Sequence, residues 1–217
     1  MDNPKISRVV TGNPASDIFA MAAWILAIPR IKPTAIAVHT GLGEHIRVEY
    51  AIKEWEVRRV PLLLLLGTNP HERTYEALTF ERLCKGPFWV DPSARGNVVT
   101  QVTAAHSKEQ AVWLVDEVRE RGIRSVELHA PAYHMPRAYL TVLAAMDSAN
   151  PFLLTPHVTP YPPGYVIPET GVRAVDMTDG EYQRIEKYQQ SGDVASRKKL
   201  IDYLDWLWQT PELLYAD

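Results

Sequence analysis

The sequence predicts an α/β protein with a mostly parallel sheet, on three observations. Short apolar runs recur along the chain, and the clearest of them, at 61–67, has no polar alternation, as in strands that are buried on both faces of a sheet. Helix-patterned segments separate these runs, and strand-helix alternation of this kind is typical of parallel sheets with helices on both faces. Polar turns follow several of the runs directly. The runs, which predict four or five strands, cover residues 35–39, 61–67, 98–102, 125–130 and 152–154.

The first half of the chain predicts three helices around two strands. Cap residues and an early proline at 13–17 indicate a helix that ends before Pro33. Between the strands at 35–39 and 61–67, Val48, Ile52 and Trp55 recur at near-helical spacing and predict an amphipathic helix. A third helix is expected from the turn at 68–73 to about Lys85, followed by a short extended piece at 88–90.

The second half predicts two more strand-helix units and a helical tail. Ser107 and Gln110 have the spacing of a capping box for a helix over 108–121, which Gly122 ends. The prolines between Thr155 and Pro168 are expected to exclude regular structure there, leaving a surface loop or a lid. Two further helices at 181–190 and 195–208 suggest a docked helical pair over 179–208, within a single domain spanning 1–217.

Composition narrows the class of protein. The 217 residues, 46% hydrophobic and 23% charged, suit one α/β domain. A net charge of −3, with both signs interspersed, favours neither nucleic acid nor an anionic membrane as partner. The single cysteine, Cys84, indicates a reducing compartment. The apolar stretch 18–31 is too short to span a bilayer and lacks the features of a secretory signal, so we expect a cytoplasmic protein with no membrane span.

The most informative segment runs from Ser125 into the helix that begins near Pro136. A continuous strand stops at Pro131 and opens through a polar loop that carries Tyr133, His134 and Arg137. Ligands of open α/β sheets bind at such carboxyl strand ends, and helix N-termini attract anions. The segment therefore predicts a binding site, in which His134 is the acid/base and Arg137 the charge clamp of any reaction.

Other strand ends contribute candidate ligand contacts to the same edge. They are Gly41, Gly43, Gly67, Thr68, Asn69 and His106. The turn at 41–43 lacks the third glycine of a dinucleotide fingerprint and the lysine of a P-loop. His39, read as a satisfied core histidine, could join His106 and His134 in a metal site if the strand ends converge. No pair of histidines has close ligand spacing, so no metal is predicted.

At these residues the chain resembles the DUF218 family, also called YdcF-like or SanA-like, over roughly 34–208. The match is carried by Gly122-Ile123-Arg124-Ser125-Val126, by Pro131-Ala132-Tyr133-His134-Met135-Pro136-Arg137-Ala138, and by the tail from Glu181 to Ile185 with 192–195. The resemblance implies a divergent bacterial member with a Rossmann-like three-layer fold. Membrane-anchored members of the family are linked to envelope integrity, and a soluble member to S-adenosylmethionine, which is therefore the one cofactor or ligand that the resemblance suggests.

The resemblance also implies site residues. The family's first glycine-rich strand end falls on Gly41 and Gly43, with its helix-borne arginine at Arg47, and its second turn falls on 67–69. A further polar pattern of the family falls on residues 101–111. Four of its positions differ in this chain, which has Gln101, Ala104, His106 and Ser107 where the family has an acid, a serine, an asparagine and a threonine. Loss of the acid removes a general base or cation ligand.

Three functional classes remain open from the sequence. The favoured one is a protein that binds an anionic or nucleotide-like small molecule, with enzymatic group transfer or hydrolysis as its activity if the site is catalytic. The alternatives are a degenerate member acting as a protein interaction module, and a metal-dependent hydrolase. Trp206 and Trp208 lie two positions apart on a helix and cannot both face inward. One of them could mark a partner surface, for which a homodimer is the simplest candidate.

Overall fold

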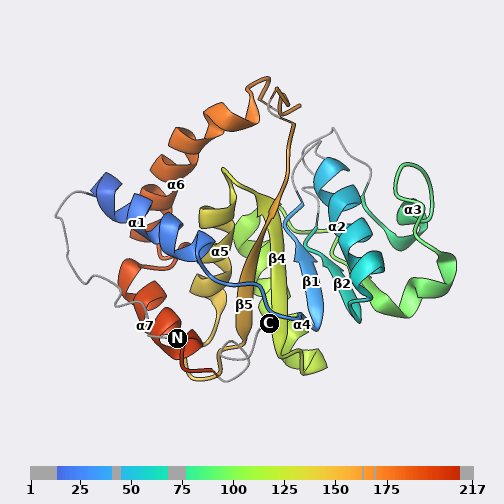
Figure 1. Cartoon of the computed structure of the whole chain (residues 1–217), viewed down its shortest axis with the longest axis horizontal. Helices are drawn as coiled ribbons and strands as arrows, with labels where there is room; N and C mark the ends of the chain where they lie inside the picture. The colour runs from blue at the N-terminus through green and yellow to red at the C-terminus, as the bar shows by residue number, and fades with distance from the viewer. Residues whose placement is uncertain (1–13, 41–44, 68–76, 163, 169, 211–217) are drawn as a thin grey trace.

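Short, largely buried segments form the strands of one five-stranded sheet. The computed structural model describes residues 14–40, 45–67, 77–162, 164–168 and 170–210 (Figure 1). The strand order is β3-β2-β1-β4-β5, and every neighbouring pair is parallel. The strands are β1 (Ala35–Val38), β2 (Leu62–Leu65), β3 (Val98–Thr100), β4 (Ser125–Pro131) and β5 (Leu153–Thr159). The predicted Rossmann-like α/β fold is confirmed, and its strand order reverses between β1 and β4, where ligands of such sheets bind.

Alternate residues of the strands point to two separate apolar layers. Ile36, Val38, Leu63 and Leu65 pack beneath α2 (His45–Arg58) and α3 (Phe80–Leu83). Ala35, Ala37 and their neighbours in β2, β4 and β5 pack against the helices of the other face. These helices are α1 (Pro14–Leu26), α4 (Ser107–Arg121), α5 (Met135–Ala145), α6 (Thr178–Gln190) and α7 (Arg197–Leu207).

The C-terminal helices dock on the domain, as the sequence predicted. Leu200, Leu204 and Leu207 of α7 are buried in the larger core, and α1, α6 and α7 lie together at the left of Figure 1. Trp206 and Trp208 are both partly buried against that core, so neither faces fully outward. No helix in the described part of the chain has the length and apolar character needed to cross a membrane.

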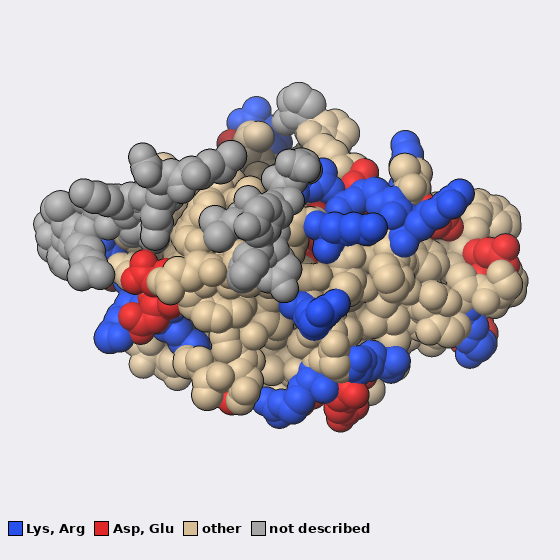
Figure 2. Space-filling model, turned by 60° about the horizontal axis from the view of Figure 1, so that its bottom comes forward, with Lys and Arg blue, Asp and Glu red and all other residues tan. Residues whose placement is uncertain are grey.

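Charged side chains are dispersed over the surface. On the face seen in Figure 2, Lys and Arg side chains form separate groups with uncharged surface between them. This face therefore offers no continuous basic surface.

The expectation that proline excludes regular structure from Thr155 onward is wrong, because β5 runs through Pro156 to Thr159. The amide of Leu153 donates to the carbonyl of Arg124, so the backbone of residues 153, 155, 157 and 159 faces β4. Pro156 therefore faces the outer edge of the sheet, where a missing N–H removes no ladder bond. Proline was tolerated because β5 is an edge strand, which its sequence alone did not reveal.

The outer backbone edge of β5 is partly covered by two tyrosines. Tyr203 of α7 accepts a hydrogen bond from the Leu154 amide at 2.8 Å and donates one to the Phe152 carbonyl at 3.0 Å. Tyr139 of α5 donates to the Leu154 carbonyl at 2.9 Å. These contacts fasten β5 to the helices behind it.

After β5 the chain folds back over the carboxyl edge of the sheet. The buried side chains of Ile167 and Ala174 pack against Tyr133. Val166 forms an antiparallel bridge with Arg173. A short 3₁₀ helix at Ala174–Met177 then leads into α6. The proline-rich segment beyond 160 is therefore packed on the polar loop that follows β4.

Two predicted segments between β2 and β3, one helical and one extended, differ from the structure. The sequence predicted a helix from the turn at 68–73 to about Lys85, but residues 68–76 are not described. In the described part of this stretch the helix is α3 alone, which Thr79 caps. No strand forms at 88–90; a 3₁₀ helix at Pro92–Asn97 leads into β3. Isolated apolar residues there join the smaller core without pairing as a strand.

Candidate functional site at the carboxyl edge of the sheet

Two histidines and a glutamate form a linear buried chain at the switch point. His39 directly follows β1, His134 immediately precedes α5, and Glu181 lies in the first turns of α6. The Nε2 atom of His134 lies 3.3 Å from Nδ1 of His39, and its Nδ1 lies 2.9 Å from Oε2 of Glu181. All three side chains are buried. We call Glu181, His134 and His39 the relay.

The hydrogen-bonding capacities of the three groups fix the protons of the relay. An ionised carboxylate can only accept, so Nδ1 of His134 carries a proton and donates it to Glu181. Nε2 of His134 is then an acceptor for the Nδ1 proton of His39. The lone pair left on His39 is at Nε2, a buried atom with no hydrogen-bond partner among the described residues. The relay therefore ends in an unoccupied basic nitrogen.

Both histidines are neutral at pH 7. Burial, with the nearby Arg137, lowers the pKa of His134 to about 4 despite the opposing effect of Glu181. Burial also lowers the pKa of His39 well below its ordinary value, and His134, Arg137 and Arg47 act in the same direction. A neutral imidazole can accept a proton, so the His39 Nε2 atom has the protonation state that a general base requires.

Glu181 also binds two arginines. Arg137 donates to it from Nε at 2.5 Å and from Nη2 at 3.3 Å, and Arg184 donates from Nη1 at 2.6 Å. Burial alone would raise the pKa of Glu181, but His134 and Arg137 outweigh burial and hold it well below the usual range. Arg137 also lies 3.2 Å from Nδ1 of His134, where two donors face each other and form no hydrogen bond. Glu181 is thus a fixed anion that organises the donors around it.

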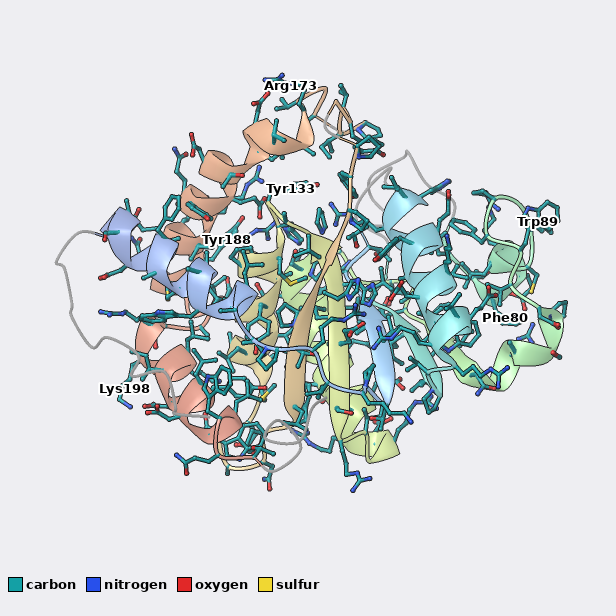
Figure 3. All side chains as sticks on the ribbon, viewed as in Figure 1. Phe80, Trp89, Tyr133, Arg173, Tyr188 and Lys198 are labelled. Carbon is teal, nitrogen blue, oxygen red and sulfur yellow. The ribbon has the colours of Figure 1, made fainter. Side chains whose placement is uncertain are left out.

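Arg47 brings a second buried guanidinium to the carbonyl side of His39. It projects from the first turn of α2 and donates to the His39 carbonyl at 3.1 Å and to the Tyr133 hydroxyl at 2.8 Å. It also donates to the Tyr161 hydroxyl at 3.0 Å. Figure 3 shows Tyr133 at the upper end of the sheet, the edge to which these groups belong. Arg137 and Arg184 both donate to Glu181, so two guanidinium groups surround this one carboxylate.

A cavity of about 300 Å³ opens beside Arg137. Ser107, whose hydroxyl accepts from Arg137 Nη1 at 3.3 Å, lines it together with Tyr188 of α6, labelled in Figure 3. Lys108 and Asp193, an ion pair with 2.6 Å between Nζ and Oδ1, form another part of the wall. This cavity gives a small polar molecule access to the arginine end of the site.

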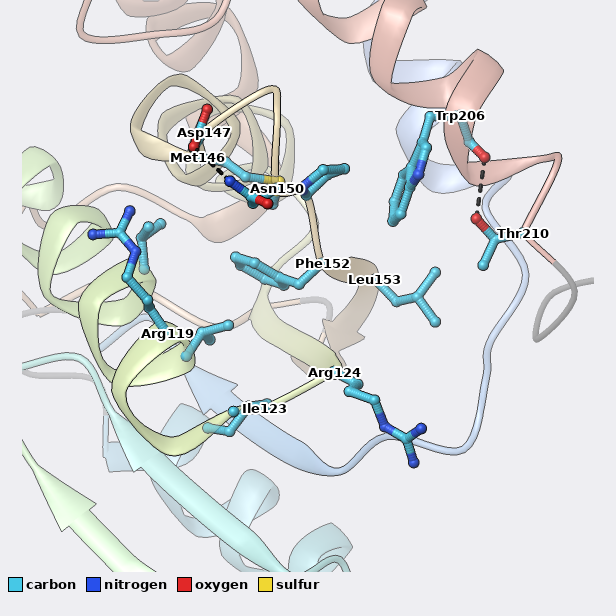
Figure 4. Close-up of a pocket in the computed structure, with 14 residues that line it drawn as sticks. Arg119, Ile123, Arg124, Met146, Asp147, Asn150, Phe152, Leu153, Trp206 and Thr210 are labelled. Atoms are coloured by element: carbon cyan, nitrogen blue, oxygen red, sulfur yellow. Dashed lines mark hydrogen bonds between the residues drawn. The ribbon is translucent and has the colours of Figure 1, made fainter.

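A second cavity of about 400 Å³ lies at the opposite edge, at the amino ends of β4 and β5. Figure 4 shows the rings of Phe152 and Trp206 on its walls, with Arg119 and Arg124 at its sides. Its lining is largely apolar and holds none of the relay residues. Of these two cavities, the one beside Arg137 is lined by a residue that contacts the relay, although His39, His134 and Glu181 themselves do not line it.

The structure brings some of the predicted site residues together. Arg47, Tyr133, His134, Arg137 and Ser107 all take part in the contacts described above. Gly41, Gly43, Thr68 and Asn69 lie outside the described residues. His39 and His134 converge as the metal hypothesis required, but the His106 side chain is 57% exposed and pairs with Glu109.

Gly67, Gln101 and His106 make hydrogen bonds that involve nearby backbone groups and do not contact the relay. The Gly67 carbonyl accepts from Nε2 of Gln110 at 2.9 Å, and Oε1 of Gln101 accepts from the Ala104 amide at 2.9 Å. The predicted capping box is wrong, because His106 is the N-cap of α4: its Nδ1 accepts from the Glu109 amide at 3.3 Å. Ser107 is the first helical residue instead, which frees its hydroxyl for Arg137.

His39 and Glu181 are the members of the candidate site that the sequence did not predict as ligand or catalytic residues. His39 was read as a satisfied core histidine, whereas its Nε2 atom has no partner in the described structure. Glu181 is 47 residues from His134, and only its place in the resembling tail could have drawn attention to it.

Comparisons with known proteins add no assignment to this geometry. No protein-family profile matches the chain, and no curated protein is significantly similar to it in sequence. Because one α/β fold supports many chemistries, function must be argued from the site itself.

Proposed function

We propose that the protein binds a small anionic molecule at the carboxyl edge of its sheet and that His39 is the general base of a hydrolysis or group transfer on it. A phosphorylated or adenosyl compound is the expected ligand. The proposal depends above all on one observation, the buried Nε2 atom of His39, which ends the relay without a partner in the described structure. A base oriented through a second group that is held by a carboxylate is the arrangement used to activate hydroxyl nucleophiles.

The charges around the relay favour an anion. Arg47 and Arg137 are each held by several hydrogen bonds, and they lie at the edge where α/β proteins bind their ligands. Rigid arginines stabilise negative charge that develops on phosphoryl oxygens without reorganising during the reaction. The proposal therefore assigns the clamp role to Arg137 and Arg47 together.

His134 is a positioning residue in this scheme. In hydrolysis of a phosphate ester, a water oxygen would attack phosphorus while Nε2 of His39 takes a proton from that water. The bond from phosphorus to the leaving oxygen breaks, and the leaving oxygen receives the proton from His39. His134 keeps its Nδ1 proton on Glu181 throughout and accepts from His39, so the carboxylate stabilises the transient imidazolium.

The resemblance to the DUF218 or YdcF-like family supports the same edge of the sheet. Its matching residues Tyr133, His134 and Arg137 are those that meet there. From that resemblance we propose a bacterial, cytoplasmic protein for which S-adenosylmethionine is one ligand to test, and from the tryptophans of α7 a homodimer. Gln101 and Ala104 stand where the family has an acid and a serine. The main alternative to the proposal is therefore that this chain has lost the activity of the family.

A thermal-shift screen with nucleotides, S-adenosylmethionine and sugar phosphates tests binding, because a ligand of the native state raises Tm. Release of phosphate or of the adenosyl group from any hit then tests turnover. We expect His39→Gln to keep the shift and lose turnover by at least 100-fold, and Arg137→Lys to reduce the shift. The matched control is Lys198→Ala, at an exposed side chain that pairs only with Asp202 among the described residues.

Two results would contradict the proposal. Turnover that survives His39→Gln would remove the general base. A folded protein that shows no shift with any compound would favour the interaction module, and protein partners would then be sought.

A further inference from the structure

A second group of ionisable side chains lies on the other face of the sheet, beneath α2. Glu127 and His129 of β4 and His157 of β5 all point to this face, because they occupy alternate positions of strands paired in register. His129 and His157 are direct neighbours in that register, and their rings stack 4.3 Å apart at an angle of 9°. The relay faces the opposite layer, so the two groups are separate.

The geometry of these three residues is that of a compact ligand set. One ligand atom from each lies within 4.8 Å of the other two, and all three side chains are buried. Oε1 of Glu127 is 2.9 Å from Nε2 of His129 and 3.4 Å from Nδ1 of His157. Ligands bound tetrahedrally to zinc at about 2.0–2.1 Å are separated by about 3.3 Å, so only small movements are needed to admit an ion.

Unpartnered polar atoms surround the same place. Nδ1 of His129, Nδ1 of His157, and the hydroxyls of Thr155 and Thr159 are buried without a hydrogen-bond partner in the described structure. All four residues are on this face of β4 and β5. Buried polar atoms are normally satisfied, and a cluster of exceptions indicates a bound species.

We propose that Glu127, His129 and His157 bind one divalent transition-metal ion of the zinc class. Two imidazoles and one carboxylate are the protein ligands of catalytic zinc sites, which keep a fourth position open. Imidazole ligands also favour zinc, cobalt and nickel over magnesium and calcium, which take oxygen ligands. The threonine hydroxyls would face the ion or the water in its open position.

The surroundings of the site both orient and restrain it. The hydroxyl of Tyr50 lies 3.0 Å from Nε2 of His157, which turns Nδ1 toward Glu127 in the manner of an outer-shell partner. Arg58 binds both oxygens of Glu127, and Arg30 Nε lies 3.3 Å from Oε2. Among the described residues, these two cations and Glu54, which pairs with them, are the charged groups that face the site.

Ion binding changes this arrangement in two ways. Oε1 of Glu127 exchanges its contact with Nη1 of Arg58 for the ion, while Oε2 stays with Nη2 of Arg58 and Nε of Arg30. The proton that Nε2 of His129 donates to Glu127 moves to Nδ1. The arginines weaken affinity, so we expect binding in the micromolar range or weaker.

Cobalt titration of the full chain, purified without a histidine tag and stripped with a chelator, tests the proposal. We expect one Co²⁺ per chain with the intense visible absorption of tetrahedral coordination, displacement by one equivalent of Zn²⁺, and a rise in Tm. His157→Gln should abolish the absorption. His39→Gln and His106→Gln, which change histidines outside the site, should leave it unaltered.

The outcomes separate this site from the relay. A folded protein that takes up no stoichiometric Co²⁺ would overturn the proposal. So would cobalt absorption that is lost in His39→Gln and kept in His157→Gln. If His157→Gln does not fold, the Co²⁺ affinity of Tyr50→Phe tests the proposal instead. Loss of this outer-shell partner should weaken metal affinity by 10-fold to 100-fold. An affinity equal to that of the unmodified chain would then contradict the assignment.

Discussion

His134 donates a hydrogen bond from Nδ1 to Oε2 of Glu181, 2.9 Å away and 47 residues along the chain. The bond joins the loop after β4 to α6, and the same carboxylate neutralises Arg137. The link between this loop and α6, and with it the order of the candidate site, therefore depends on one buried anion.

Replacement of Glu181 by Gln tests this dependence. The substitution leaves the largely buried Arg137 without its countercharge, so we expect the free energy of unfolding to fall by about 3–5 kcal/mol. Urea denaturation followed by circular dichroism measures the change. Arg184→Gln is the control, because its side chain is 46% exposed and its pairing with Glu181 should contribute only about 0–1 kcal/mol. Equal effects of the two substitutions would show that Glu181 acts only as a surface partner.

Acid should destabilise the protein already between pH 6.5 and 4. The pKa of His134 falls from 6.5 to about 4 on folding, and that of His39 moves in the same direction. In this window the unfolded chain binds protons that the folded protein does not, so stability is full above pH 6.5 and is lost as pH falls. His134 alone accounts for about 3 kcal/mol.

Urea denaturation at pH 8, 6, 5 and 4.5 measures this loss. His134→Gln should be less stable at pH 8 and should show a shallower decline. A stability that stays constant from pH 8 to 5 would be inconsistent with buried neutral histidines.

Gly67 should tolerate no side chain. Its φ of +96° is a conformation that L residues rarely adopt, and an added Cβ would lie 2.9 Å from the Gln101 carbonyl oxygen. We expect Gly67→Ala to cost about 2–4 kcal/mol through backbone strain and overlap. Gly180→Ala, in α6 with no atom within 4 Å of the new Cβ, should instead stabilise the helix by about 0.5–1 kcal/mol. Similar values for both in urea denaturation would argue against the close approach at Gly67.

Proline substitutions should distinguish the two edges of β5. Leu153→Pro removes the amide that donates to Arg124, so it should be about 3 kcal/mol less stable than Leu153→Ala. Val158 turns its amide to the outer edge, and Val158→Pro should therefore stay within about 1 kcal/mol of Val158→Ala. Thermal unfolding of the four variants makes the comparison. A large loss at both positions would mean that the inferred backbone orientation of β5 is incorrect.

The sequence was informative where a residue's role depends on its near neighbours. An unbroken apolar run predicted β2, and the segment 125–130, which stops at Pro131, predicted β4. Gly122 predicted the end of α4, where it adopts a φ of +63°. The loop after β4 was singled out because strand, polar turn and helix follow one another along the chain. All of these signals are local.

The errors at Pro156, His39 and His157 have one physical cause, which is that partners distant in sequence decided the outcome, whereas the error at Ser107 has a local one. Whether Pro156 belongs to a strand depends on which edge of the sheet β5 occupies. The role of His39 depends on His134, 95 residues away, and His157 acquires its significance only beside Glu127 and His129. Ser107 lost the helix cap because the neighbouring His106 competes for it.

The occupied outer backbone of β5 limits how copies of the chain can associate. An exposed strand edge normally invites another strand to extend the sheet. Here the hydroxyls of Tyr139 and Tyr203 already bind the outward groups of residues 152 and 154, and Pro156 has no N–H to offer the next position. A sheet continuous through two copies cannot form along this stretch, so a homodimer would have to meet through its helices or through the three-residue strand β3.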